Sequence, residues 1–485
     1  MKVSRRLSAL CVLMSSPLFI FGAHAATFEV TSAADDGAGS LREAVALANA
    51  SEAETVTITF ADGLGTIALT SGQLVMTRDL SIIGPEDAQW IDAGGQSRIM
   101  VATEQNTHLQ LENLVLVNGR TESAGNFFEP CTVSTGEGGA VCARGSLTVS
   151  NSVIADNSTN GHLARGGGLY SQGDMTLDRV SVVGNFTEGE DSHGGGLAAR
   201  GTLVMENCLV AENLTQGIFS FSGGVDAGQS STVHNCLIRD NGAQAWGSWC
   251  GGMFSFGPMT LSHSTLAGNF TLGEDGKAGA LGANNELHII NSTISGNWTE
   301  GPNSSVGAVV AWGNTQIHNS TITDNSSEGG PAGLALRGAS GTRTLHMHST
   351  ILAGNSGPEG NFDGPLPDTA EAEINVHHSL FGDDEVEITD SNQANIFTDQ
   401  PGVLELADND CAESVGAFHH VACVSTHGLH HLSPALHAGA NPLELETDQR
   451  GEGFPRENPL QIDIGAFETP SAVIFEDRFE SGMLD

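Results

Sequence analysis

Two segments 28 residues apart, Asn291-Ser-Thr-Ile-Ser-Gly-Asn297 and Asn319-Ser-Thr-Ile-Thr-Asp-Asn325, decide the fold of this chain. The same pattern, an apolar residue three positions before a closing Asn, recurs upstream at the same spacing without a gap. The closing residues form one column: Asn157, Asn185, Asn213, Asn241, Asn269, Asn297 and Asn325. A fixed period between about 20 and 50 residues is the signature of an architecture in which each repeat stacks on the next.

Apolar residues within each repeat are spaced by two, in short runs rich in Val, Ile and Thr, which is typical of strands rather than helices. They fall into three columns, represented in one repeat by Leu281, Ile289 and Ile294. A leucine-rich repeat would need a Leu-x-x-Leu-x-Leu pattern, which this sequence lacks. The sequence therefore predicts an all-β, single-stranded β-solenoid with three short strands and about 28 residues per coil, closed by irregular terminal caps.

The column of Asn residues follows from the same stacking. Asn tolerates the left-handed backbone conformation that a sharp bend needs, and stacked side-chain amides can hydrogen-bond along a ladder. We therefore predict a structural Asn ladder. Several of these residues also begin an Asn-x-Thr/Ser tripeptide, which we interpret as turn chemistry because glycans one strand spacing apart would collide.

Residues 1–25 are predicted to be an export signal peptide. Lys2, Arg5 and Arg6 precede a short apolar run, and Ala23-His24-Ala25 fits a cleavage site of small residues. The run is too short to span a bilayer and no other long apolar segment follows, so we expect no transmembrane segment. With 18 Lys+Arg against 58 Asp+Glu, the formal net charge is −40. Nucleic acid is therefore an improbable partner, because phosphate binding needs clustered basic residues.

An exported protein can form disulfide bonds. Two predicted pairs are close in sequence: Cys131 with Cys142, and Cys411 with Cys423. Cys208 and Cys236 share an inward column one coil apart, where buried packing is favoured over a bond because parallel Cβ vectors lie too far apart. The partner of Cys250 is left open.

Several motifs resemble those of bacterial polymorphic outer-membrane and related right-handed parallel β-helix repeats. Coils open with Gly-Gly-x-Leu, as in Gly166-Gly-Gly-Leu169, and end with hydrophobic-x-x-Asn. Gly39-Ser-Leu-Arg-Glu-Ala-Val45 resembles the CSLREA motif, with Gly39 in place of the leading Cys. Asp448-Gln-Arg-Gly451 and Asp463-Ile-Gly-Ala-Phe-Glu468 resemble the choice-of-anchor Q region.

This resemblance implies a right-handed parallel β-helix that is secreted or displayed on the cell surface of a Gram-negative bacterium. It also divides the chain into five parts: the signal peptide (1–25), an N-terminal cap (26–100), the β-helix repeats (101–360), a C-terminal cap (361–468) and a short tail (469–485).

The residue after each closing Asn provides the ligand-binding candidates Phe186, Phe270 and Trp298. If the Asn points inward, its neighbour points outward, and Phe270 and Trp298 would form a flat apolar strip for sugar rings. The alternative is that loop residues cover these rings. We therefore expect a monomeric adhesion or glycan-contact protein, with glycans or host and cell-surface molecules as partners.

The second functional class is a polysaccharide lyase or glycoside hydrolase acting in a groove along the β-helix. Asp, Glu, Arg or His gathered in one groove would favour the enzyme, whereas an unbroken strip led by Phe270 and Trp298 would favour binding. The motifs of such enzymes are not assembled here, and the net negative charge should repel an acidic polysaccharide unless cations bridge the two. His427 and His430 have a spacing that suits zinc, but no third ligand is evident. We predict no catalytic residue, cofactor or metal.

Overall fold

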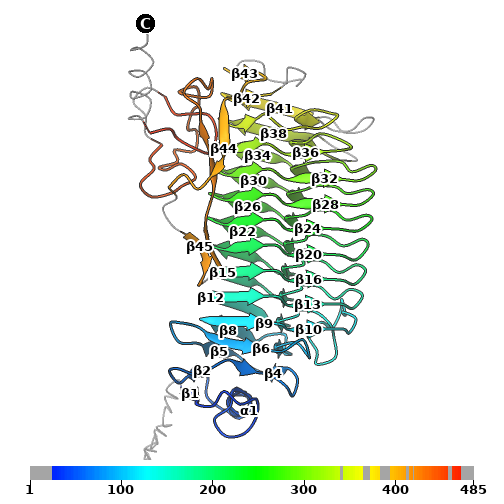
Figure 1. The fold of residues 1–485 in the computed structure, drawn as a ribbon, viewed down its shortest axis with the longest axis vertical. Helices are drawn as coiled ribbons and strands as arrows, with labels where there is room; N and C mark the ends of the chain where they lie inside the picture. Colours follow the sequence, from blue (N-terminus) through cyan, green and yellow to red (C-terminus); the bar gives the residue numbers. More distant parts are fainter. Residues whose placement is uncertain are drawn as a thin grey trace, which may run out of the picture.

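The computed structural model describes residues 24–338, 342–363, 372–382, 394–410, 414–418, 420–456 and 461–470. In these residues the chain winds into a rod of stacked coils, with helix α1 (Leu41–Ala50) at one end (Figure 1). Strands of successive coils pair in parallel, and register partners such as Leu281 and Val309 lie one period apart. The predicted fold, an all-β right-handed parallel β-helix, is therefore confirmed.

Three parallel sheets run along the rod. Sheet A contains β1 (Ala25–Val30), β2 (Thr55–Phe60), β3 (Ile67–Ala68), β5 (Leu80–Ile83), β6 (Gln89–Asp92), β8 (His108–Glu112), β9 (Leu114–Val117), β12 (Ser146–Ala155), β15 (Met175–Val183), β18 (Leu203–Glu206), β19 (Leu209–Ala211), β22 (Ser231–His234), β23 (Leu237–Arg239), β26 (Met259–Ser262), β27 (Thr265–Ala267), β30 (Leu287–Ile290), β31 (Thr293–Ser295), β34 (Thr315–His318), β35 (Thr321–Thr323), β38 (Arg343–His348), β39 (Ile351–Leu352), β41 (Ala372–His377), β42 (Leu380–Phe381) and β43 (Ile396–Phe397). Sheet B contains β4 (Leu74–Met76), β7 (Met100–Ala102), β11 (Val141–Ala143), β14 (Leu169–Ser171), β17 (Leu197–Ala199), β21 (Val225–Ala227), β25 (Met253–Ser255), β29 (Leu281–Ala283), β33 (Val309–Ala311), β37 (Leu334–Leu336) and β40 (Phe362–Asp363). Sheet C contains β10 (Arg120–Thr121), β13 (Ser158–Thr159), β16 (Phe186–Thr187), β20 (Leu214–Thr215), β24 (Gly242–Ala243), β28 (Phe270–Leu272), β32 (Trp298–Glu300) and β36 (Ser326–Ser327).

A typical coil has four short strands, whereas the sequence predicted three. The coil from β25 to β28 contributes one strand to sheet B, two to sheet A and one to sheet C. A left-handed residue, His263 at φ 50°, bends the chain between the two sheet A strands. The fourth strand was missed because it turns a Thr inward rather than an apolar residue. Thr271, for example, is fully buried and donates its hydroxyl to the carbonyl of Ala278 at 2.6 Å.

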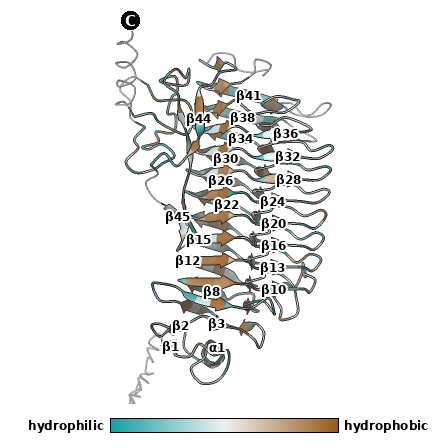
Figure 2. Ribbon diagram, in the orientation of Figure 1, coloured by the Kyte–Doolittle hydropathy of each residue, from teal (hydrophilic) through white to brown (hydrophobic). Residues whose placement is uncertain are grey.

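The three predicted apolar columns fill the interior of the rod. Leu281, Ile289 and Ile294 are fully buried and belong to one continuous hydrophobic core. Figure 2 shows hydrophobic strand residues stacked along the whole rod. Because each coil repeats the same inward side chains about 4.8 Å further along, the core is a stack of similar layers.

The Asn residues form a buried ladder between sheets A and C. The side-chain nitrogen of Asn213 donates to the side-chain oxygen of Asn241 at 2.9 Å, and the backbone N–H of Asn213 donates to the same oxygen at 3.0 Å. The second amide hydrogen of Asn213 reaches the carbonyl of Val182 at 2.9 Å. The expectation that these Asn residues themselves are left-handed is wrong, because the residue before each one takes that conformation, as Glu212 does at φ 58° and Asp240 at φ 55°.

Helix α1 covers the N-terminal end of the stack within residues 26–100. Ser40 caps the helix by accepting the N–H of Glu43 at 3.2 Å, and Glu43 accepts the N–H of Gly39, the residue before the cap, at 2.6 Å. Gly39 has φ 77°, and a Cβ there would lie 2.3 Å from the hydroxyl of Thr31. A residue with a side chain would be strained at this position. β2 and β5 pair in parallel, so the coils of the β-helix begin within residues 26–100.

Beyond β43, the chain turns back and lies against the flank of the rod. Its antiparallel pairs are β44 (Val403–Ala407) with β47 (Thr426–Leu429), and β45 (Ser414–Ala417) with β46 (His420–Cys423). Figure 1 shows β44 and β45 beside sheet A. The N–H of Ala417 donates to the hydroxyl of Ser181 at 2.7 Å, and Arg456 donates to the side chain of Asn291 at 2.6 Å. Much of the expected C-terminal cap thus forms a strap along the flank.

The cysteines divide into bonded and buried thiols. Cys131 and Cys142 form a disulfide with a Cα–Cα distance of 5.3 Å. Cys423 is also disulfide-bonded, and its predicted partner Cys411 lies outside the described residues. The remaining described cysteines are free and buried: Cys208, Cys236 and Cys250. Cys208 and Cys236 therefore pack as predicted, without a bond.

Candidate functional site

The predicted aromatic strip lies on the outer side of sheet C. Phe270 and Trp298 are register partners, and their rings stack with centroids 5.0 Å apart and planes 14° apart. Both side chains are half-buried, so loops cover them only in part. The two rings therefore stack one coil apart, and each covers one face of the other.

The residues at the same position in neighbouring coils of sheet C decide how far the aromatic strip extends. In place of a side chain, Gly242 provides space for the ring of Phe270, because a Cβ there would lie 2.3 Å from its Cζ atom. Phe186, the third candidate, pairs with Leu214 and lies on the far side of Gly242. At the other end Trp298 pairs with Ser326, a small exposed residue. The strip is therefore short, with one face of Trp298 directed toward a small neighbour.

A second aromatic group, which we call the sheet B band, lies on the outer side of sheet B. It consists of Phe221, Trp249, Phe254, Phe256 and Trp312. Phe221 and Trp249 have ring centroids 4.7 Å apart, and Trp249 stacks on Trp312 at 5.3 Å. Four of the rings are half-buried, whereas Phe254 is fully buried. The band therefore offers a larger set of partly exposed rings than the strip on sheet C.

A cluster of charged and polar residues adjoins the band along the rod. Tyr170, Ala198 and Asp226 follow one another in register on the outer side of sheet B. Arg165 and Arg200 lie close enough to Asp226 to interact with it electrostatically. We call Arg165, Tyr170, His193, Arg200 and Asp226 the Asp226 cluster.

Burial is the main cause of the pKa shifts in the Asp226 cluster. Burial raises the pKa of Asp226 against the lowering influence of Arg165 and Arg200, and it raises the pKa of Tyr170 to about 12. Burial and the charges of the two arginines hold the pKa of His193 well below its usual range. His193 is therefore neutral, and its Nδ1 accepts the N–H of Phe221 at 2.8 Å. The ring of His193 also stacks on Phe221 at 4.5 Å, which joins the cluster to the band.

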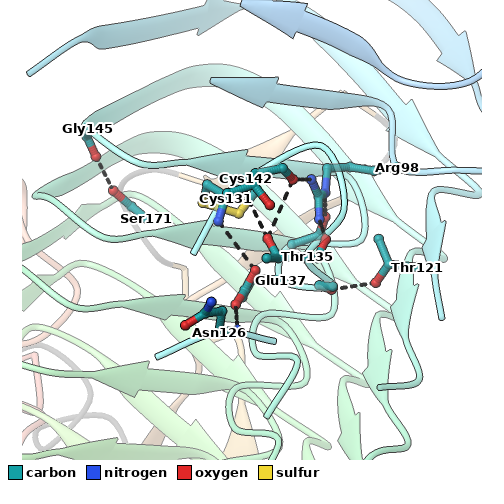
Figure 3. The surroundings of a disulfide bond; sticks show 12 residues. Arg98, Thr121, Asn126, Cys131, Thr135, Glu137, Cys142, Gly145 and Ser171 are labelled. Atoms are coloured by element: carbon teal, nitrogen blue, oxygen red, sulfur yellow. Dashed lines mark hydrogen bonds between the residues drawn. A yellow bond between two sulfur atoms is a disulfide. The ribbon is translucent and has the colours of Figure 1, made fainter. Parts of the chain in front are cut away.

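The loop that carries Cys131 places an aromatic ring against the two arginines. The centroid of the Phe127 ring lies 4.9 Å from the guanidinium carbon of Arg200 and 5.6 Å from that of Arg165. Figure 3 shows how the loop is held: the disulfide ties Cys131 to Cys142 on β11, and Glu137 accepts the N–H of Asn126. The loop that carries Cys131 thus has a definite place beside the Asp226 cluster.

Comparison with known proteins supports the architecture. A family model described as the right handed beta helix region matches residues 114–274. By its fold, the chain is a β-helix repeat protein. The matched part of this β-helix protein includes the Asp226 cluster and most of the sheet B band. No curated protein matches the chain. Within the described residues, no helix has the length and apolar character needed to cross a membrane, and no group of three His, Cys, Asp or Glu side chains is placed to hold a metal ion.

Sequence reasoning missed the Asp226 cluster, although the repeat alignment contains a signal for it. Asp226 is the one charged residue in a column of apolar and small residues that runs from Cys142 to Ala335. His427, considered as a zinc ligand, is instead buried between strands, with its Nε2 atom 2.8 Å from the hydroxyl of Ser295.

Proposed function

We propose that this β-helix protein is exported and contacts glycans at the cell surface or outside the cell, with Trp298 as the principal contact. The observation that carries the proposal is the half-buried Trp298 ring, supported on one side by Phe270 and followed in its column by Ser326. Sugars pack on aromatic rings through their apolar C–H faces, and a ring already held by a neighbour loses little conformational freedom on binding. The basic and apolar composition of residues 1–25 supports export.

A glycan array probed with the chain beginning at Ala26 tests this function. We expect binding to at least one class of glycan, and we expect Trp298→Ala to weaken it by about 30-fold, because truncating a central aromatic anchor costs about 2 kcal/mol. Trp90→Ala is the matched control, since Trp90 is an exposed tryptophan on β6, outside sheet C. Absence of glycan binding, or equal losses in the two variants, would contradict the proposal.

The Asp226 cluster favours a second candidate function, cleavage of a polysaccharide. A carboxyl group whose burial favours its protonated form is suited to general acid catalysis. Incubation with a panel of polysaccharides, followed by assays for reducing ends and unsaturated products, tests for turnover. Turnover that Asp226→Asn abolishes would establish the enzyme function in place of simple binding.

A further inference from the structure

We propose that the Asp226 cluster is a binding site for the anionic group of an acidic glycan. Arg165 and Arg200 hold the carboxylate or sulfate, and the sheet B band supports the sugar rings that follow. This site is separate from the aromatic strip of Phe270 and Trp298 on sheet C, and the proposal does not require that strip to bind a glycan.

Polar atoms without partners mark the site. Asp226 is fully buried, yet neither oxygen of its carboxyl group has a hydrogen-bond partner among the described residues. Buried atoms on the same side of sheet B share this condition: Nε of Arg144, Nε of Arg165 and Oε1 of Gln172. Buried polar groups in folded proteins nearly always have partners, so several orphans in one place indicate a position that a polar ligand occupies.

Charge identifies the ligand as an anion. This chain has 58 acidic residues against 18 basic ones, yet Arg144, Arg165 and Arg200 gather on neighbouring coils of one face. Burial and the neighbouring charge of Arg200 lower the pKa of Arg165, and within the described residues neither guanidinium group forms an ion pair. Burial favours the uncharged form of Asp226. An anionic ligand between Arg165 and Arg200 accepts hydrogen bonds from both guanidinium groups and relieves the repulsion between them.

Asp226 and Ala198 are fully buried, whereas Arg165 and Arg200 are half-buried, so a ligand reaches the cluster through the two guanidinium groups. Ala198 contributes only a methyl group between Tyr170 and Asp226, which are its register partners on either side. Phe127, of which 58% is exposed, lies against both arginines from the loop side and limits their movement. Arginine held by a ring keeps its planar donors available, which suits two-point recognition of a carboxylate or sulfate.

The sheet B band continues from the cluster as a line of rings. His193 stacks on Phe221 at 4.5 Å, and Phe221 contacts Trp249, which in turn stacks on Trp312. The centroids follow one another at about the spacing of the coils. An anionic sugar at Arg165 and Arg200 would therefore be followed by rings that can contact its neighbours. The overall negative charge of the protein disfavours acidic polysaccharides in general, whereas Arg165 and Arg200 provide two positive groups at this position.

Isothermal titration of the chain beginning at Ala26 tests the site, with an oligogalacturonate as the carboxylate probe, a heparin oligosaccharide as the sulfate probe and dextran as the neutral probe. We expect binding of one or both acidic probes, weakened by salt, and no binding of dextran at this site. Arg200→Gln and Arg165→Gln should each lower the affinity by about tenfold or more, as expected for a hydrogen bond to a charged group. Arg200→Lys should restore part of the loss, because it keeps the charge.

Two control variants distinguish binding at the Asp226 cluster from binding elsewhere on the protein. Arg239→Gln removes an arginine of sheet A that pairs with Asp240 and should leave the affinity unchanged. Trp298→Ala should also leave the affinity for the acidic probes unchanged, because that affinity does not depend on the aromatic strip on sheet C. The inference is overturned if neither acidic probe binds at low salt, or if Arg239→Gln weakens binding as much as Arg200→Gln. Circular dichroism of each variant verifies folding, and a misfolded Arg200→Gln would leave Arg165→Gln and Arg200→Lys to decide.

Discussion

Replacing one amide of the Asn ladder provides the most direct test of what holds the coils together. The side-chain oxygen of Asn241 accepts two hydrogen bonds from Asn213, at 2.9 Å from its side chain and 3.0 Å from its backbone. Its side-chain nitrogen donates to Asn269 at 2.9 Å and to the carbonyl of Val210 at 2.9 Å. All of these groups are buried, so water cannot replace a lost partner without entering the core.

Asn241→Ala removes all four hydrogen bonds. The oxygen of Asn269 keeps one donor, because the backbone N–H of residue 241 still reaches it at 3.1 Å. The backbone N–H of Asn213, one of its amide hydrogens and the carbonyl of Val210 each lose a partner. At about 1–3 kcal/mol for each buried group left unsatisfied, and with some relaxation of the coil, we expect a loss of about 4 kcal/mol in the free energy of unfolding.

Urea unfolding followed by far-ultraviolet circular dichroism measures the effect. Stacked repeats can unfold in more than one step, so the first transition is the one to compare between variants. Asn314→Ala is the matched control, because Asn314 is exposed and its side chain accepts one hydrogen bond, from the N–H of Thr344 at 3.2 Å; its loss should stay within about 0.5 kcal/mol. A loss below about 1 kcal/mol in Asn241→Ala, or one no larger than in the control, would refute the view that the ladder is a main source of stability.

Three further predictions concern the aromatic strip, the anchored loop and pH. Gly242→Ala should displace the ring of Phe270 and weaken glycan binding at Trp298, as measured on the same glycan, while leaving the circular dichroism spectrum unchanged. Cys131→Ser should cost about 2–3 kcal/mol of stability by opening a short cross-linked loop, and it should also weaken acidic-glycan binding because Phe127 is no longer held; unchanged urea midpoint and affinity would contradict this. Burial holds the pKa of His263 near about 4, and its Nε2 accepts a hydrogen bond from Asn291 at 3.0 Å. Because the unfolded state binds this proton at higher pH, stability should fall as pH drops from about 6.5 to 4, and His263→Gln should flatten the fall in urea midpoint.

The regular part of the fold could be predicted because one constraint repeats in every coil. Most inward positions of sheets A and B are apolar, and residues such as Ile289 and Ile294 show this directly in the sequence. The fourth strand was not predicted because its inward residue is polar, as Thr271 is. A Thr in the sequence does not indicate burial, although in the structure its hydroxyl donates to a nearby carbonyl. The left-handed bend was assigned one residue too late for a similar reason, since both Asp240 and Asn241 suit a turn.

The strap illustrates contacts that no local pattern reveals. Gln449 donates to the hydroxyl of Thr265 at 2.7 Å and accepts from that of Thr293 at 2.6 Å, across more than 150 residues of chain. Side chains of this kind carry no periodicity of their own, and their partners are ordinary members of the repeat columns. Only the folded path of the chain brings them together.

The sequence by itself determined the winding of this protein: the period, the inward columns and the identity of the ladder residues. These are properties of neighbours in successive coils, and a strict repeat places such neighbours at a known separation. The tertiary structure alone decided which outward residues meet, because outward side chains contact loops and distant segments whose positions follow from the completed rod. Asp226 became a candidate for ligand binding only when its burial, its lack of partners and the approach of Arg165 and Arg200 were seen together.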